Sequence, residues 1–153
     1  MIGSRDGLFY INEATGIVKS FVKPVLTSDL ILTICFYEGE YYIGTYGGGM
    51  MVLNPQTLSL KYFTQGDTEL FQKGHIFCVK PDNRGNLWIG TSQGLFCYNG
   101  QTKQIKNFTS TNSQLPEGNV YEVSFDSTGK GWIATETGMC IYAPASQSLR
   151  QIR

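Results

Sequence analysis

A repeat of about 44 residues constrains the fold of this chain more than any other feature. Its clearest copies lie at residues 82–96 and 126–140, which share an Asp-x-x-Gly turn and a Trp-Ile pair. A degenerate copy lies at residues 40–51, and the chain opens inside a fourth at residues 2–9. The isoleucines at positions 2, 43, 89 and 133 are separated by steps of 41, 46 and 44 residues. A fixed period of this length predicts repeated supersecondary units that share one core.

Each full copy contains four short apolar segments separated by turn residues. In the third copy, Asp82 opens a tight turn and Gly85 can adopt a positive φ, which predicts a type I turn with a glycine bulge. The segments of the three full copies are 32–37, 41–45, 50–53 and 58–63; 76–80, 87–91, 95–98 and 104–108; and 120–125, 132–135, 139–142 and 148–152. The first copy lacks its first segment and continues through 8–11 and 17–21. Four antiparallel strands per unit of this length predict a β-propeller blade.

The predicted fold is therefore all-β, with about four four-stranded antiparallel blades, the first incomplete, as part of a larger propeller. One array spans residues 1–153, with blades at about 1–23, 30–64, 75–109 and 119–153. The connections at 23–29, 64–73 and 109–118 are expected to be polar loops, with essentially no helix.

One blade position carries only small residues, and this predicts close packing there. The residues are Gly3, Gly44, Gly90 and Ala134. A small residue in a strand allows a neighbouring backbone or a large side chain to approach. Trp88 and Trp132, which precede this position, are expected to point to the opposite face.

The charge balance restricts the classes of partner. Twelve basic residues balance twelve acidic ones, which argues against nucleic acid and against membrane contact by this segment. No apolar run approaches the roughly 20 residues of a transmembrane helix. The first residues also lack the layout of a signal peptide, so no export signal is expected in the chain as written.

Residues 115–135 and 82–96 resemble the two-component regulator propeller repeat. Residues 115–135 show its order of Leu-Pro, an inner strand, Asp-x-x-Gly and a variant of Trp-Ile-Gly-Thr. Residues 82–96 show Asp-x-x-Gly, Trp-Ile-Gly-Thr and Gly-Leu. The second copy departs from this pattern, with Tyr42 in place of Trp and no Asp-x-x-Gly. The resemblance implies an extracytoplasmic, periplasmic sensor region of a membrane-anchored hybrid histidine kinase. Relatives in gut bacteria respond to polysaccharide fragments, so the resemblance also implies non-catalytic ligand recognition and carbohydrate sensing.

The candidate ligand-binding residues lie in loops at one rim of the predicted blades. Loops that vary while their scaffold repeats are free to recognise a ligand, and ordinary solvated loops are the alternative. Tyr46 stands out because it precedes three glycines, which predict a flexible loop. The candidates after second strands are Arg5, Tyr46, Ser92 and Glu136, and those before inner strands are His75 and Asn119.

Other reactive residue types favour structural roles. Asp82 and Asp126 suit turn capping better than calcium binding, because a calcium loop needs several oxygen ligands and each turn contains a cation. His75, the only histidine, lacks partners at metal-ligand spacing, so no metal and no cofactor are expected. The four cysteines alternate with large apolar residues in strands, which favours buried free thiols over disulfides.

Two other functional classes stay open. The first is a propeller enzyme of the streptogramin-lyase-like type, which would need clustered acid and base groups. The second is a protein-interaction scaffold. The incomplete first blade leaves apolar faces to cover, so the expected partner is the rest of a longer propeller or a second copy of the chain. A homodimer would give a ring of eight blades, and a stable monomer would indicate a closed ring of four.

Overall fold

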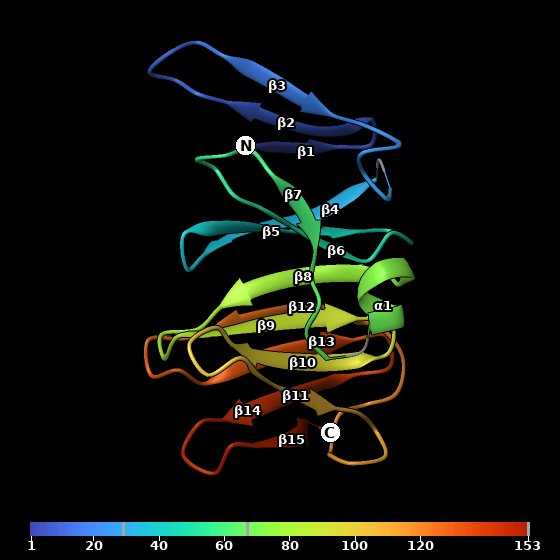
Figure 1. The fold of residues 1–153 in the computed structure, drawn as a ribbon. Helices are drawn as coiled ribbons and strands as arrows, with labels where there is room; N and C mark the ends of the chain where they lie inside the picture. Colours follow the sequence, from blue (N-terminus) through green and yellow to red (C-terminus); the bar gives the residue numbers. More distant parts are fainter. Residues whose placement is uncertain (29, 67, 153) are drawn as a thin grey trace. The chain divides into compact units, whose positions relative to one another are not determined.

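A computed structural model describes residues 1–28, 30–66 and 68–152, and this part of the chain forms one three-stranded and three four-stranded antiparallel sheets (Figure 1). Each sheet is built from consecutive strands. The chain divides into two compact units, Met1–Ile76 and Phe77–Arg153, called unit 1 and unit 2. The all-β fold of four-stranded antiparallel repeats is confirmed, and the first repeat lacks its inner strand as predicted.

Unit 1 contains two sheets and the only helix of the described residues. The first sheet has the order β1-β2-β3, formed by β1 (Ile2–Ser4), β2 (Gly7–Ile11) and β3 (Val18–Phe21). The second has the order β4-β5-β6-β7, formed by β4 (Ile31–Tyr37), β5 (Glu40–Thr45), β6 (Met50–Leu53) and β7 (Leu60–Tyr62). Helix α1 (Thr68–Lys73) follows β7.

Unit 2 contains the other two sheets. Its first strand begins at Ile76, which is the last residue of unit 1. The third sheet consists of β8 (Ile76–Pro81), β9 (Asn86–Thr91), β10 (Gly94–Asn99) and β11 (Gln104–Phe108). The fourth consists of β12 (Val120–Phe125), β13 (Gly131–Thr135), β14 (Met139–Ala143) and β15 (Ser148–Ile152).

The glycines of the Asp-x-x-Gly turns have the positive φ that was predicted. Gly85 has a φ of 82° and Gly129 a φ of 83°, the left-handed region that glycine adopts without steric cost. The shorter turn of the second sheet uses Glu38 and Gly39, with φ values of 49° and 81°. Two consecutive positive φ values are typical of the type I′ hairpin, whose twist matches that of the flanking strands.

The core of unit 2 lies between its two sheets. The Trp88 ring lies 5.7 Å from the ring of Phe125 and 4.6 Å from that of Tyr142, and Trp88 is fully buried. A Cβ atom on Gly90 would lie 2.7 Å from the carbonyl oxygen of Val120. The predicted close approach at the small residue is therefore confirmed.

The predicted orientation of the tryptophans is wrong. Trp88 and Gly90 both face the fourth sheet, because residues two apart in a strand lie on the same face.

The connection at residues 64–73 is not simply a polar loop. It contains α1, whose Leu70 and Phe71 are buried, and the Phe71 ring lies 4.9 Å from that of Phe63. A helix of six residues is too short to show helical periodicity in the sequence, and tertiary packing of its apolar side chains stabilises it. The helix also lacks the length and hydropathy required to cross a membrane.

Candidate functional site

Each loop after a second strand is closed by the same side-chain hydrogen bond. The hydroxyl group that ends the strand donates to the carbonyl oxygen of a glycine three or four residues later. The four bonds are Ser4 Oγ to Gly7 O (3.1 Å), Thr45 Oγ1 to Gly49 O (2.9 Å), Thr91 Oγ1 to Gly94 O (2.8 Å) and Thr135 Oγ1 to Gly138 O (2.8 Å). This role was not predicted, although Ser or Thr recurs at the end of the second strand in all four copies.

The loop that carries Tyr46 is held by hydrogen bonds on several sides. Ser28 Oγ donates to the carbonyl oxygen of Tyr46 (2.9 Å), and Thr27 Oγ1 donates to that of Gly48 (2.6 Å). The amide of Gly49 donates to the carbonyl oxygen of Gly74 (2.9 Å). The glycines of this loop therefore allow close packing against neighbouring backbone, in addition to turning the chain.

Tyr46 and His75 are brought together by this anchored loop. Their ring centroids are 4.0 Å apart with an interplanar angle of 30°. Tyr46 is 51% exposed and His75 is partly buried, so the pair presents an accessible aromatic surface. A fixed, exposed ring can pack against a flat or weakly polar face of a ligand.

Three of the predicted residues lie at one edge of unit 2. The amide of Glu136 donates to the carbonyl oxygen of Asn119 (2.9 Å), and the amide of Asn119 donates to Glu136 Oε2 (3.3 Å). Asn119 Nδ2 donates to the Tyr121 hydroxyl (3.0 Å). Ser92 lines a hollow of about 340 Å³ with Glu117 and Gly118, the residues that precede Asn119.

Arg5 is exposed in the turn between β1 and β2 of unit 1. Within residues 1–28, 30–66 and 68–152, no hydrogen bond or ion pair links it to Tyr46 or His75. The structure therefore forms two groups of predicted residues, Tyr46 with His75 in unit 1 and Ser92, Asn119 and Glu136 in unit 2. Whether any of the six binds a ligand stays a prediction.

The turn-capping role of Asp82 is confirmed. Its Oδ1 accepts hydrogen bonds from the amides of Arg84 (2.8 Å) and Asn86 (2.9 Å), and its Oδ2 accepts from Trp88 Nε1 and Asn86 Nδ2, both at 2.9 Å. Partial burial alone would raise the pKa of the Asp82 carboxyl, but the hydrogen bonds from Trp88, Asn86 and Arg84 outweigh burial and hold the pKa below its usual value.

Asp126 caps the equivalent turn in the fourth sheet. Its Oδ1 accepts from the Thr128 hydroxyl and amide and from the Lys130 amide. The Thr128 hydroxyl makes the largest contribution to lowering the pKa of this carboxyl. In the described part of the chain, no three His, Cys, Asp or Glu side chains are grouped so that they could hold a metal ion.

The cysteines are free thiols, as predicted. Cys35, Cys78 and Cys140 are buried and Cys97 is partly buried. Burial raises the pKa of the thiols of Cys78 and Cys97 to about 12 and that of Cys140 to about 11. These three thiols are therefore protonated at neutral pH and are poor nucleophiles.

A cavity of about 520 Å³ lies at the other end of strand β9 from Ser92, within unit 2. Asn86, Trp88 and Lys106 of the third sheet line it together with Tyr142 of the fourth sheet. Its residues come from four strands and three turns, so no contiguous sequence signal marked it.

Comparisons with known proteins agree with the repeat and the fold. The family model described as the two component regulator propeller matches residues 71–93. No curated protein sequence matches the chain significantly. The chain resembles the extracellular domain of the hybrid two component system BT3049 of B. thetaiotaomicron with a TM-score of 0.83 and 24% identity, covering 98% of this chain and 21% of that one.

Two further solved structures share the fold. The extracellular domain of BT4673 from the same organism gives a TM-score of 0.77 at 22% identity, covering 98% of this chain and 20% of that one. PorZ of Porphyromonas gingivalis, a surface component of a type-IX secretion system, gives 0.63 at 16% identity, covering 86% of this chain and 18% of that one. This chain thus spans about a fifth of the length of these proteins. The predicted resemblance is confirmed: residues 71–93 match the two component regulator propeller model, and nearly the whole chain has the fold of hybrid two-component extracellular domains.

Proposed function

We propose that this chain is a non-catalytic ligand-recognition segment in the extracytoplasmic part of a hybrid two-component sensor. The observation that carries the proposal is the Tyr46–His75 pair, an exposed aromatic surface held by an anchored loop. The family match at residues 71–93 and the shared fold support the sensor assignment.

An oligosaccharide is the ligand class that we propose for this surface. Sugar rings have a weakly polar face of C–H groups, and an exposed tyrosine ring offers a complementary flat surface with a hydroxyl at its edge. Fixing the loop before binding reduces the entropy that a ligand must overcome. The hydroxyl bonds to Tyr46 and Gly48 therefore favour binding as well as folding.

Calorimetric titration with neutral oligosaccharides tests this proposal. Tyr46→Ala removes the exposed ring and should weaken binding about tenfold or more, while Tyr46→Phe keeps the ring and should retain most of it. Tyr62→Ala is the matched control, because Tyr62 is 40% exposed on β7 of the same unit. Binding that is equally strong in wild type and Tyr46→Ala would contradict the proposed site.

The non-catalytic part of the proposal has its own test. An oligosaccharide that binds should be recovered unchanged after long incubation, as judged by mass spectrometry. A turnover product would favour the propeller-enzyme alternative. Absence of binding to any oligosaccharide, with retained binding to a protein partner, would favour the scaffold alternative.

The partner prediction concerns two exposed apolar surfaces. On the first sheet, Ile2 and Val18 are 54% and 61% exposed, and on the fourth sheet, Trp132 and Met139 are 39% and 44% exposed. We propose that further blades or a second copy of the chain cover these surfaces, since exposed apolar patches mark association sites. If this chain alone sediments as a monomer at all concentrations, the proposal that a second copy covers these surfaces is contradicted.

A further inference from the structure

The cavity of about 520 Å³ in unit 2 is lined by aromatic rings and by two cations. Its floor is one face of the third sheet, on which side chains from neighbouring strands lie in rows. Strand register places Trp88, Cys97 and Lys106 in one row and Asn86, Asn99 and Gln104 in the next. All six residues line the cavity.

The fourth sheet covers only part of this face. Tyr142 packs edge-on against Trp88, with ring centroids 4.6 Å apart, and is itself 8% exposed. Phe108 stacks on Trp88 at 5.8 Å and completes the apolar wall. The row of amide side chains continues beyond these rings, and Gln147 of the turn between β14 and β15 closes another side of the cavity.

Among the described residues, two cations and no carboxylate line the cavity. The cations are Arg84, in the turn before β9, and Lys106, whose Nζ lies 4.8 Å from the centroid of the Phe108 ring. Neither forms an ion pair within the described residues. The nearby Asp82 does not line the cavity, and its two oxygens accept four hydrogen bonds from Arg84, Asn86 and Trp88.

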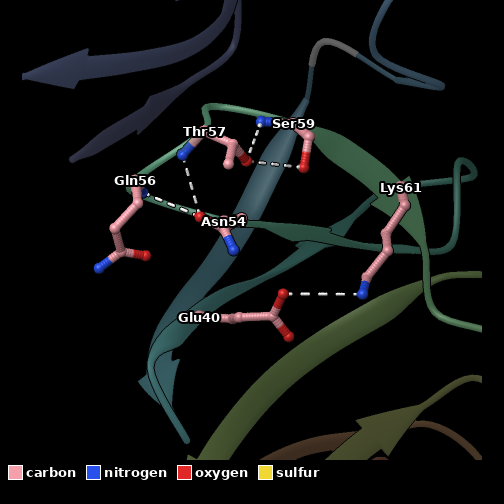
Figure 2. Close-up of polar contacts among 6 residues, drawn as sticks. All are labelled: Glu40, Asn54, Gln56, Thr57, Ser59 and Lys61. Carbon is pink, nitrogen blue, oxygen red and sulfur yellow. Dashed lines mark hydrogen bonds and ion pairs between the residues drawn. The ribbon is translucent and has the colours of Figure 1, made fainter.

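In the second sheet, the lysine equivalent to Lys106 is neutralised by a carboxylate. Lys61 and Lys106 occupy equivalent positions, because Lys61 lies opposite Val52 and Lys106 lies opposite Cys97. Glu40 and Asn86 are also equivalent, because each lies two residues before an aromatic residue of its strand, Tyr42 or Trp88. Figure 2 shows the Lys61 Nζ directed at Glu40, 3.6 Å from its Oε1. The third sheet keeps the lysine and replaces the glutamate with an uncharged amide, so its positive charge faces the cavity without a partner carboxylate.

The turns beside the two lysines are otherwise alike. Asn54 Oδ1 accepts from the amides of Gln56 (2.9 Å) and Thr57 (3.1 Å), also drawn in Figure 2. Asn99 Oδ1 accepts from the amides of Gln101 and Thr102, both at 3.0 Å. The two sheets therefore share this turn, and the residue two positions before Tyr42 or Trp88 is a glutamate in one sheet and an asparagine in the other.

We propose that this cavity binds a small hydroxylated organic anion, specifically a sugar acid of one or two rings. Lys106 and Arg84 would bind the carboxylate, and charge-assisted hydrogen bonds of this kind are the strong ones. The amides of Gln104 and Gln147 offer both donors and acceptors to hydroxyl groups. The volume lies within the usual range for small-molecule sites, about 300–1,000 Å³. This proposal is independent of the Tyr46–His75 surface, which lies in unit 1.

Calorimetry with digalacturonate at low ionic strength tests the site in a Tyr46→Ala background, which removes the proposed neutral-sugar surface. Neutral galactobiose and glucose 6-phosphate are the comparison ligands. Digalacturonate should bind, and galactobiose should bind at least about tenfold more weakly. Asn86→Glu should reproduce the neutralised arrangement of the second sheet and weaken digalacturonate binding about tenfold. Lys106→Gln and Arg84→Gln should also weaken it, whereas Lys61→Gln is the matched control and should leave it unchanged.

Thermal unfolding followed by circular dichroism shows that each variant is folded. Equal affinity for galactobiose, or unchanged affinity in Asn86→Glu, would overturn the proposal. Tighter binding of glucose 6-phosphate would overturn the carboxylate assignment in favour of a phosphate. Absence of digalacturonate binding would also overturn it, and would leave the Tyr46 titration with neutral oligosaccharides unaffected.

Discussion

Trp88 and Trp132 occupy the same position in adjacent repeats but have different surroundings. Trp88 is fully buried, and its indole nitrogen donates to Asp82 Oδ2 at 2.9 Å. Trp132 is 39% exposed, and the described residue that lies over its ring is Lys130, with Nζ 4.7 Å from the centroid. The equivalent Asp126 makes its hydrogen bonds within its own turn.

The difference arises from what packs against each face. Tyr142 and Phe125 of the fourth sheet cover Trp88. Within the described residues of unit 2, no aromatic ring covers Trp132 in the same way. The same repeat motif therefore contributes core packing in one sheet and a partly solvated surface in the next.

Trp88→Ala gives the largest expected effect. Removing a fully buried tryptophan should lower the free energy of unfolding by about 3–5 kcal/mol, because the transfer energy is lost and a cavity remains. Urea unfolding measured by circular dichroism should show Trp132→Ala costing only about 1 kcal/mol. Equal losses for the two variants would mean that Trp132 is covered in solution.

Gly90→Ala should have the next largest effect. Its Cβ would lie 2.6 Å from Cys78 Sγ and 2.7 Å from the Val120 carbonyl oxygen, and the resulting overpacking should cost about 1–3 kcal/mol. The fourth sheet already has Ala134 at this position. Ala134→Gly should cost roughly 0.5–1 kcal/mol through strand flexibility alone. A Gly90→Ala protein as stable as wild type would show that the two sheets of unit 2 can move apart.

Asp82→Asn and Asp126→Asn compare how much each capped turn contributes to stability. The folded pKa of Asp82 is lowered, so its contribution is present above the unfolded carboxyl pKa of about 4 and is lost as pH falls through the folded pKa. At pH 7 the variant should lose about 1 kcal/mol, after allowance for partial solvent screening. The difference from wild type should shrink in unfolding curves recorded below pH 4. Asp126→Asn should give a smaller loss at pH 7, and the reverse order would show that the indole bond of Asp82 does not stabilise the fold.

Lys130→Gln should have the smallest effect. It removes the cation over the exposed Trp132 ring and should cost about 0.5 kcal/mol, typical of exposed cation–π pairs. The fluorescence maximum of Trp132, recorded in a Trp88→Phe background, should change with the substitution. An unchanged spectrum and unchanged stability would show that the lysine does not reside over the ring in solution.

Several features of the fold were predictable because they depend on local conformation. The repeat period, the strands and the positive φ at Gly85 all follow from residues within one turn or strand. The close approach at Gly90 also followed, because a small residue recurs at that position in every copy. The face of Trp88 was predicted wrongly, although the spacing of two residues to Gly90 already decides it.

The candidate site was less predictable from the sequence. The loops after the second strands were located correctly, but the anchoring of Tyr46 depends on Thr27 and Ser28, which precede it by about 20 positions in the chain. Helix α1 depends on the packing of Phe71 against Phe63 rather than on its own propensity.

By itself, the sequence determined the local chemistry of each repeat: where strands begin and turn, which turns need glycine, and where charges lie. Only the tertiary structure decided which of two equivalent tryptophans is buried. It also decided that Lys106 lines a cavity, whereas Lys61 pairs with Glu40. The reason is physical. Backbone preferences act between neighbouring residues, whereas burial and charge compensation depend on side chains brought together from separate strands and sheets.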